Sequence, residues 1–229
     1  MPESHQPHQP QDRHDHAGHA AEKPHFAGAF WAWRFSRFPR RLAAWRSGEP
    51  MDRLIRELNL RGDEKVLDVG CGAGYYAMRV AARLPGGLVT GLDPAPDFIA
   101  RLQSDALRRF GNGRVRPLIG SAQSIPLADA SQDAVYSVAA LHHVPDPRAA
   151  LAEMTRVLKP GGRLILLDWR QNPRHKGHGE EPRVGKHGHR HAPFGPLDME
   201  NLQRLAGLRQ AFVESNKRWV YGFGIKPED

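Results

Sequence analysis

Apolar and polar positions follow two alternating periods along the middle of the chain. Mostly apolar stretches of strand length occupy residues 66–69, 88–93, 115–119, 133–138 and 163–168. Between these runs, apolar residues recur every three or four positions, the period of a helix, over residues 51–60, 76–84, 98–110 and 145–158. Strands that alternate with helices are typical of a parallel sheet covered on both faces. The pattern therefore predicts an α/β fold.

The C-terminal part follows the pattern less regularly. A helix is expected over residues 197–208, followed by one or two strands over 212–225 that turn near residues 214–217. Before them, residues 170–196 form a basic insert rich in His, Gly and Pro. A connection this long without regular structure is often a lid or a binding loop. His187, His189 and His191 alternate and could share a metal ion, but no acid or Cys accompanies them, so a mobile basic loop is the preferred interpretation.

Two segments of different character precede the first strand. Residues 1–25 are rich in His and Pro and almost free of apolar residues, so we expect a disordered tail. Residues 26–61 are expected to form a helical cap, because aromatic residues recur at helical spacing and Arg residues occupy another face. The aromatic face of 26–46 could cover a ligand pocket, which is favoured, or lie on an anionic membrane surface. The main domain is placed at 62–229.

Composition restricts the class of protein. The formal charge is +8, and the excess of Arg and Lys lies in the flanking segments, so an anionic partner is conceivable for them alone. The single cysteine, Cys71, excludes a disulfide framework and a cysteine zinc site, and no metal site is predicted. There is no apolar run of about 18 residues, nor a signal-peptide pattern. A soluble cytoplasmic protein is expected.

The stretch from residue 65 to residue 77 carries the most specific chemistry. An apolar run ends at three glycines, Gly70, Gly72 and Gly74, and a helix follows at once. This strand, turn and helix form a nucleotide-binding unit, in which the backbone approaches the ligand and the helix N-terminus offers N–H groups. Asp68 suits a cationic group, and Tyr75 stands where a dinucleotide loop that starts at Gly70 needs a small residue. S-adenosylmethionine fits better than a nicotinamide cofactor, which stays the first rival.

Further polar residues follow the ends of the other predicted strands. Asp93 ends the second strand, 23 residues after Gly70, where an acid can accept hydrogen bonds from a ribose diol. Ser121, His142 and Trp169 follow the third, fourth and fifth strands. Because ligands of parallel sheets bind beyond the carboxyl ends of the strands, these residues are expected to share one site.

The order of these motifs resembles a known family. From about residue 65 to 227 the chain is similar to class I S-adenosylmethionine-dependent methyltransferases, in particular the type-11 group that includes ubiquinone- and menaquinone-biosynthesis enzymes. The resemblance rests on Val-Leu-Asp-Val-Gly-Cys-Gly-Ala-Gly at 66–74, Gly-Leu-Asp at 91–93, Leu-His-His-Val at 141–144 and Arg-Val-Leu-Lys-Pro-Gly-Gly at 156–162. It implies a Rossmann-like sheet of seven strands, mostly parallel, whose last strand is antiparallel.

The resemblance also implies roles for single residues. Those that hold the methionine part of the cofactor are Asp68, Gly70, Cys71, Gly72, Gly74 and the backbone near Ala139. Asp93 and Pro94 border the ribose, and Ser121 and Ala122 border the adenine. Many relatives have Asp where Ser121 stands. A hydroxyl is a weaker acceptor than a carboxylate, so looser cofactor binding is expected.

Methyl transfer to a small molecule is the function that the resemblance implies, with an oxygen, nitrogen or carbon acceptor left open. His142 or His143 is the best-placed general base, although correct orientation alone can drive such a reaction. A His-rich metal-binding protein on the same scaffold is one alternative. A nucleic-acid methyltransferase is another, but no Asn-Pro-Pro-Tyr-like motif is present and no nucleic-acid partner is expected. The sequence does not indicate an oligomeric state.

Overall fold

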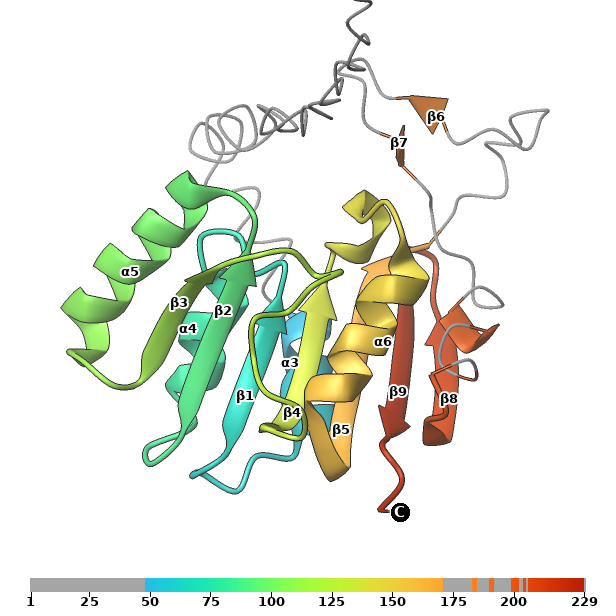
Figure 1. Cartoon of the computed structure of the whole chain (residues 1–229), viewed down its shortest axis with the longest axis horizontal. Helices are drawn as coiled ribbons and strands as arrows, with labels where there is room; N and C mark the ends of the chain where they lie inside the picture. The colour runs from blue at the N-terminus through green and yellow to red at the C-terminus, as the bar shows by residue number, and fades with distance from the viewer. Residues whose placement is uncertain are drawn as a thin grey trace, which may run out of the picture.

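The structure, a computed structural model, describes residues 48–170, 183–184, 190–191, 199–201, 204 and 206–228. Its main feature is a seven-stranded sheet with the order β3-β2-β1-β4-β5-β9-β8 (Figure 1). The strands are β1 (Lys65–Val69), β2 (Leu88–Asp93), β3 (Val115–Ile119), β4 (Gln132–Val138), β5 (Leu158–Trp169), β8 (Arg209–Ser215) and β9 (Trp219–Ile225). Six of the seven strands run in the same direction, and β9 runs antiparallel to them. The predicted α/β fold, with seven strands and an antiparallel last strand, is confirmed.

Helices cover both faces of the sheet (Figure 1). One face packs against α3 (Glu49–Leu58), α4 (Tyr75–Ala81) and α5 (Pro96–Phe110), through side chains such as Leu54, Val80 and Leu102. The other face packs against α6 (Pro147–Val157), Ile125 of the β3–β4 connection, and Met199. The apolar runs predicted as strands are therefore buried from both sides, which explains why they show no polar alternation.

The fifth strand is longer than its sequence pattern suggested. The strand was predicted over 163–168, but residues 159–162 also lie inside β5, because Leu158 already pairs with Gln132 and Arg163 pairs with Ala134. The residues between form an irregularity, where Gly161 has a φ of 71°. Its N–H donates to the carbonyl of Lys226, whose own N–H donates to Gly162. The predicted start of the strand was therefore wrong, because hydrogen bonds to the chain after β9 keep these residues in the sheet.

The C-terminal hairpin is confirmed. Strands β8 and β9 are joined around Asn216, whose side-chain oxygen accepts from the backbone N–H groups of Arg218 and Trp219, both at 2.8 Å. In the predicted helix at 197–208, residues 199–201 and 204 are helical. The insert at 170–196 was expected to be structureless, but β6 (Arg183–Val184) and β7 (Arg190–His191) form an antiparallel pair. Two extended pieces of backbone can pair in this way even within a connection that lacks the hydrophobic periodicity of a strand.

Several expectations lie outside the described residues. They concern the tail at 1–25, the segment 26–46 and the two histidines at positions 187 and 189. Within the part of the chain that the structure describes, no helix is long and apolar enough to cross a membrane. In the same part, no group of three or more His, Cys, Asp or Glu side chains is arranged to hold a metal ion.

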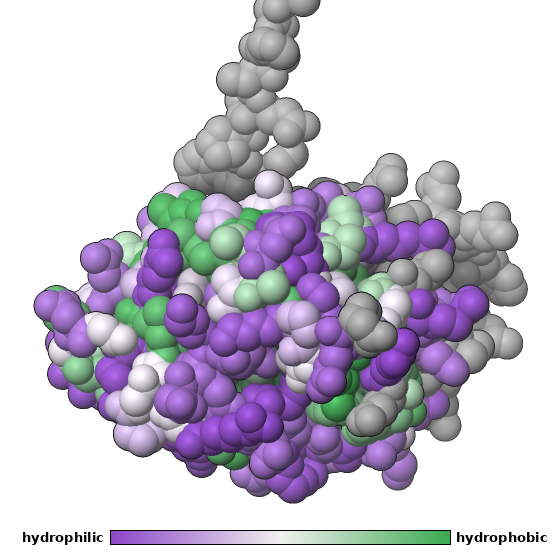
Figure 2. All heavy atoms as spheres, turned by 60° about the horizontal axis from the view of Figure 1, so that its bottom comes forward, coloured by the Kyte–Doolittle hydropathy of each residue, from purple (hydrophilic) through white to green (hydrophobic). Residues whose placement is uncertain are grey.

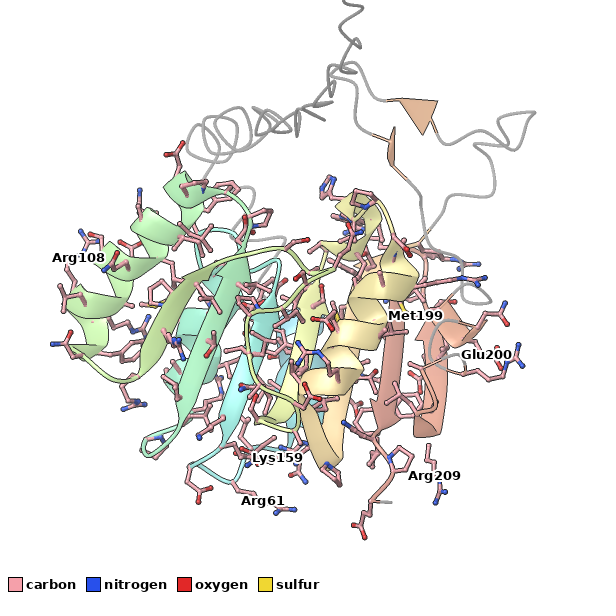
Figure 3. The ribbon with its side chains drawn as sticks, in the orientation of Figure 1. Arg61, Arg108, Lys159, Met199, Glu200 and Arg209 are labelled. Carbon is pink, nitrogen blue, oxygen red and sulfur yellow. The ribbon has the colours of Figure 1, made fainter. Side chains whose placement is uncertain are left out.

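Ion pairs join the amino ends of the strands. The buried carboxylate of Glu64 lies 2.6 Å from the Arg163 guanidinium and also accepts from the N–H of Arg61, at 2.6 Å. Asp133 accepts from Lys159 and from the backbone of Lys65. Figure 3 shows Arg61 and Lys159 at the lower edge of the sheet. Figure 2, in which the bottom of Figure 1 comes forward, shows that the surface there is mostly hydrophilic. These charges hold strands together at the end away from the predicted site.

Candidate active site

The glycine loop begins directly after β1 and is shaped by its neighbours. The N–H groups of Gly70 and Cys71 both donate to the carbonyl of Leu92 at the end of β2, at 2.8 and 3.0 Å. Gly70 has a φ of 74°, and a Cβ built there would lie 2.3 Å from the Cβ of Ala140. Gly70 is thus required both by its backbone conformation and by the close approach of the segment after β4.

Two further glycines in the loop have different surroundings. Gly74 precedes α4 with a φ of 83°, and a Cβ there would lie 2.2 Å from Cδ1 of Leu102 on α5. Gly72 has a φ of 52°, but a Cβ there would meet no heavy atom of the described residues within 4 Å. The loop is therefore packed against the protein at Gly70 and Gly74 and open at Gly72.

Asp93 holds the open part of the loop. One carboxylate oxygen accepts from the N–H of Gly72 and the other from that of Ala95, both at 2.9 Å. Burial raises the pKa of Asp93 above its ordinary value, although these two hydrogen bonds act in the opposite direction. Pro94, which follows, is exposed. Each carboxylate oxygen can accept a second hydrogen bond, so Asp93 can also receive a ligand hydroxyl.

Asp68 is buried beneath the loop and is paired with a residue that the sequence pattern did not reveal. Its carboxylate accepts from the hydroxyl of Tyr136 on the adjacent strand β4, at 3.0 Å. Burial first, and then the Asp68 charge, raise the pKa of Tyr136 well above its ordinary value, so the hydroxyl stays a donor. A single phenol within the apolar run 133–138 was the available signal. Tyr136 fixes the direction of Asp68 at the strand end.

Cys71 faces inward from the same loop. Its thiol is buried and lies 3.3 Å from the carbonyl of Gly72. Burial raises the pKa of the Cys71 thiol far above its ordinary value, and the charges of Asp68 and Asp93 add to this effect. A neutral buried thiol is a poor nucleophile, so Cys71 contributes to the loop as a small, well-packed residue.

The predicted adenine-side residues lie on the loop after β3. Gly120 donates its N–H to the carbonyl of Asp93 at 3.2 Å, which places this loop beside the end of β2. Ser121 is exposed, and its hydroxyl oxygen accepts from the N–H of Gln123 at 3.1 Å. Ala122 is half-buried. Part of the accepting capacity of Ser121 is therefore used inside its own turn.

An Arg–Glu pair on α6 holds the rest of that loop. Arg156 donates to the carbonyls of Ile125 and Leu127, at 2.8 and 2.9 Å, and to Glu153. Glu153 in turn accepts from the N–H of Ile125 at 2.8 Å. The side-chain hydrogen bond from Arg156 lowers the pKa of Glu153 below its ordinary value, against the smaller effect of burial. The adenine-side loop thus takes its position from α6.

Replacing Glu153 by Ala is expected to lower the free energy of unfolding by about 1–3 kcal/mol, because three donors lose their acceptor. A carboxyl whose folded pKa is depressed stabilises the fold above its unfolded pKa, and this contribution is lost as the pH falls through the folded pKa. The difference between wild type and variant in urea unfolding should therefore shrink at acidic pH.

Asp105→Ala provides a matched control for this experiment. Asp105 accepts from Arg101 and from Arg108 on the surface of α5, so its loss should cost about 1 kcal/mol or less. Equal losses in the two variants would show that the Glu153 pair does not hold the loop.

The segment after β4 brings the two candidate histidines to the same edge. Ala139 has a φ of 54°, and its N–H donates to the carbonyl of Leu167 on β5 at 2.8 Å. A short 3₁₀ turn, η1 (Leu141–His143), follows, with β7 beside it. A non-glycine residue in the left-handed region costs energy and is often found at functional sites. Here it turns the chain so that His142 points toward the end of β5.

His142 and His143 have different surroundings. Nδ1 of His142 lies 2.7 Å from Oδ1 of Asp168, and its main-chain N–H donates to Oδ2 of the same carboxylate at 3.1 Å. His143 is exposed, and its ring lies against that of His142, with centroids 3.9 Å apart. The two candidates thus differ in position: His142 lies against the buried carboxylate of Asp168, whereas His143 is exposed.

Asp168 was missed as a site residue. Asp168 stands at the end of a mostly apolar stretch just before Trp169, in the same way as Asp68 and Asp93 stand at the ends of theirs. This shared position was the sequence signal that could have identified Asp168. Trp169 stacks on Trp219 across β5 and β9, with ring centroids 4.6 Å apart. The stacked pair packs with the core cluster on the face that α3, α4 and α5 cover.

All the predicted site residues lie along the carboxyl edge of the sheet. The loop residues are joined through Asp93, and Ala140 brings the histidine segment against Gly70. This edge therefore combines the glycine backbone at Gly72, a buried acid at the end of β2, and an imidazole–carboxylate pair at the ends of β4 and β5. Such a combination fits a ligand with hydroxyl and amino-acid groups.

The sheet order and the glycine loop define the class I S-adenosylmethionine-dependent methyltransferase fold. Residues 67–166 match the family model described as the methyltransferase domain. A methyltransferase from Aquifex aeolicus, described as SAM dependent, shares the fold with a TM-score of 0.62 at 24% identity, over 76% of this chain and 88% of that chain.

Two curated relatives are similar at the sequence level. A 27-O-demethylrifamycin SV methyltransferase from Amycolatopsis mediterranei is 37% identical over 118 residues, which make up 52% of this chain and 43% of that protein. A ubiquinone/menaquinone biosynthesis C-methyltransferase from Syntrophotalea carbinolica is 36% identical over 117 residues, or 51% of this chain and 48% of that protein. The chain thus spans about half the length of these relatives.

Proposed function

We propose that this protein transfers the methyl group of S-adenosylmethionine to a small-molecule acceptor. The observation that carries the proposal is the open backbone at Gly72, joined to the carboxylate of Asp93. The names of the two relatives above describe methyl transfer to small molecules, one to oxygen and one to carbon, and this supports a small-molecule acceptor.

The residues of the site fit this cofactor. The loop backbone from Gly70 to Gly74, with Asp68 beneath it, would receive the methionine part, together with the backbone at Ala139. Asp93 would accept from the ribose hydroxyls, beside Pro94, and the loop at Ser121 and Ala122 would border the adenine.

The bound cofactor would supply an activated methyl group on a positively charged sulfur. The protein would then hold the acceptor in line with that methyl group, exclude water, and remove a proton where the acceptor carries one. Orientation of this kind can contribute about 7–11 kcal/mol in favourable cases. His142 is the candidate for the proton, and Trp169, at the end of β5, would border the acceptor.

Calorimetry on the full chain tests the proposal. Titration with S-adenosylmethionine and with its demethylated product should give binding heat, whereas NAD should give none. Binding of NAD without binding of either sulfur compound would overturn the proposal and favour the nicotinamide alternative.

Ser121→Asp is expected to tighten binding of S-adenosylmethionine by about five- to tenfold. One carboxylate oxygen can keep the hydrogen bond from Gln123, while the other accepts from the adenine amino group, and charged acceptors form stronger hydrogen bonds. Ser124→Asp adds the same charge to the same exposed turn and serves as the control. Equal tightening in both variants would attribute the effect to general charge and not to the adenine contact.

A further inference from the structure

Three cationic side chains gather at the turn between β8 and β9, beside the carboxyl end of β5. Arg170 directly follows β5, Lys217 and Arg218 lie in the turn, and all three are exposed. The main-chain N–H of Arg170 donates to the carbonyl of Arg218 at 2.9 Å, and Nη1 of Arg170 donates to the carbonyl of Asn216, also at 2.9 Å. The Arg170 guanidinium therefore lies on the turn that carries the other two cations.

Asn216 holds this turn in a fixed shape. Its side-chain oxygen accepts from the N–H groups of Arg218 and Trp219, and its side-chain nitrogen donates to Glu49, at the start of α3, at 2.8 Å. The main-chain N–H of Asn216 donates to the carbonyl of Trp219 at 3.0 Å, which closes the hairpin. Arg170 and Arg218 are thus attached to a backbone that needs little ordering to receive a ligand, and this lowers the cost of binding.

The neighbouring positions of Arg170 and Arg218 cost energy when no anion is bound, because like charges on adjacent strands repel one another. Acidic side chains beside the turn are bonded to other groups: Glu49 accepts from Asn216, and Glu214 accepts from Arg53 on α3, at 2.8 Å. An oxyanion between the two arginines would remove the repulsion. Guanidinium groups suit this role, since their N–H donors match the oxygens of carboxylates and phosphates.

The position of Arg170 connects this cationic turn with the proposed active site. Arg170 lies two residues after Asp168, and alternation along an extended segment places the two positions on the same face. Two residues of a strand span about 6–7 Å, which is comparable with the length of a small aromatic acid. An acceptor held by its anionic group at Arg170 would therefore extend toward His142, which Asp168 contacts.

We propose that Arg170 and Arg218 bind an oxyanion of the methyl acceptor, either a carboxylate or a phosphate, and so select acidic acceptors over neutral ones. The inference rests on the proposed function and adds the chemical class of the acceptor. A guanidinium has five N–H donors, and the hydrogen bond to Asn216 uses one of those of Arg170. Arg170 can therefore bind an anion and keep the hydrogen bond that places it on the turn.

Binding of simple oxyanions can be measured without a cofactor or an acceptor. The full chain is titrated with inorganic phosphate and, separately, with acetate, at an ionic strength held constant with chloride. Nitrogen-15 NMR follows the guanidinium Nε–H signals, which Arg170→Gln and Arg218→Gln assign by their disappearance. We expect both signals to shift and to reach saturation. Saturation by phosphate, by acetate or by both supports the proposal and distinguishes the two kinds of anion, whereas no saturation by either overturns it.

Loss of either arginine is expected to weaken binding of the saturating anion by about tenfold or more, followed at the signal of the other arginine, because a charged donor is removed. Both side chains are exposed, so the variants should fold as the wild type does. Arg209→Gln is the matched control, since it removes the same charge from the opposite end of the hairpin, at the lower edge in Figure 3. Equal weakening in this control would attribute binding to general charge and overturn the site.

The preference among acceptors tests the same site during the reaction. Hydroxylated benzoates are compared with the corresponding neutral benzamides as methyl acceptors. Wild type should have the higher kcat/KM for the acid of each pair. Arg170→Gln should lower the ratio of acid to amide by about tenfold, through KM, while kcat stays within about threefold. An unchanged ratio in Arg170→Gln would overturn the proposal.

Calorimetry with S-adenosylmethionine on the same sample keeps the two proposals apart. Saturable binding of an oxyanion without binding of S-adenosylmethionine would overturn the proposed function but leave the anion site established. Binding of S-adenosylmethionine without saturable binding of phosphate or acetate would support the function and overturn the anion site.

Discussion

His142→Gln is expected to slow methyl transfer by about 10²- to 10⁴-fold, the usual contribution of a positioned general base. Glutamine retains a polar side chain near Asp168 but cannot take up a proton at neutral pH. The rate is measured with labelled S-adenosylmethionine at saturation, on the best acceptor from a panel of phenols, amines and 1,3-dicarbonyl compounds. Binding of S-adenosylmethionine, measured by calorimetry, should stay within about threefold of wild type, or 0.7 kcal/mol.

His143→Gln separates the pair. Because His143 is exposed, its replacement should slow the reaction by less than about tenfold, or 1.4 kcal/mol. Equal losses in the two variants would mean that the stacked rings act together. A wild-type rate in His142→Gln would show that orientation alone is sufficient and that His142 is not a base.

Gly72→Ala is expected to weaken binding of S-adenosylmethionine by about 10- to 100-fold. Among the residues that the structure describes, no atom lies within 4 Å of the new methyl group, so it would occupy the space that we assign to the cofactor. Inserting a methyl group into an occupied space typically costs about 1–3 kcal/mol, which corresponds to this loss of affinity. The measurement is a calorimetric titration of the folded variant.

The control for Gly72→Ala is Gly113→Ala. Gly113 also has a positive φ and open space around its Cβ position, but it lies in the turn before β3. Each variant should lose about 1–2 kcal/mol of stability from the left-handed backbone, and only Gly72→Ala should lose affinity. Unchanged affinity in Gly72→Ala would place the ligand elsewhere on the edge.

The sequence predicted most of the fold because buried strands and amphipathic helices carry local signals. Strands β2 and β3 have the predicted bounds, since glycine, proline or an acidic residue marks their ends. The start of β5 was misplaced, because Pro160 and the following glycines are typical of a turn. Their hydrogen bonds to Lys226 connect positions far apart in the chain, which a local pattern cannot contain.

The contrast between local signals and contacts over long distances in the sequence also explains which site residues were predicted. The glycine loop and Asp93 were found from spacing along the chain, because they follow consecutive strands. Tyr136 and Asp168 were not found, because each meets its partner, Asp68 or His142, across neighbouring strands. The hydrogen bond that the Ser121 hydroxyl accepts from the N–H of Gln123 was not predicted either, because it depends on the conformation of the turn.

The order of the strands has a consequence for how such a protein can change its preference among acceptors. The glycine loop, the histidine turn and Asp168 follow β1, β4 and β5, which are three adjacent strands in the middle of the sheet. Their relative geometry is therefore fixed by backbone pairing and does not depend on peripheral segments. Substitutions at the margins could alter which compounds are admitted while donor and base keep their alignment.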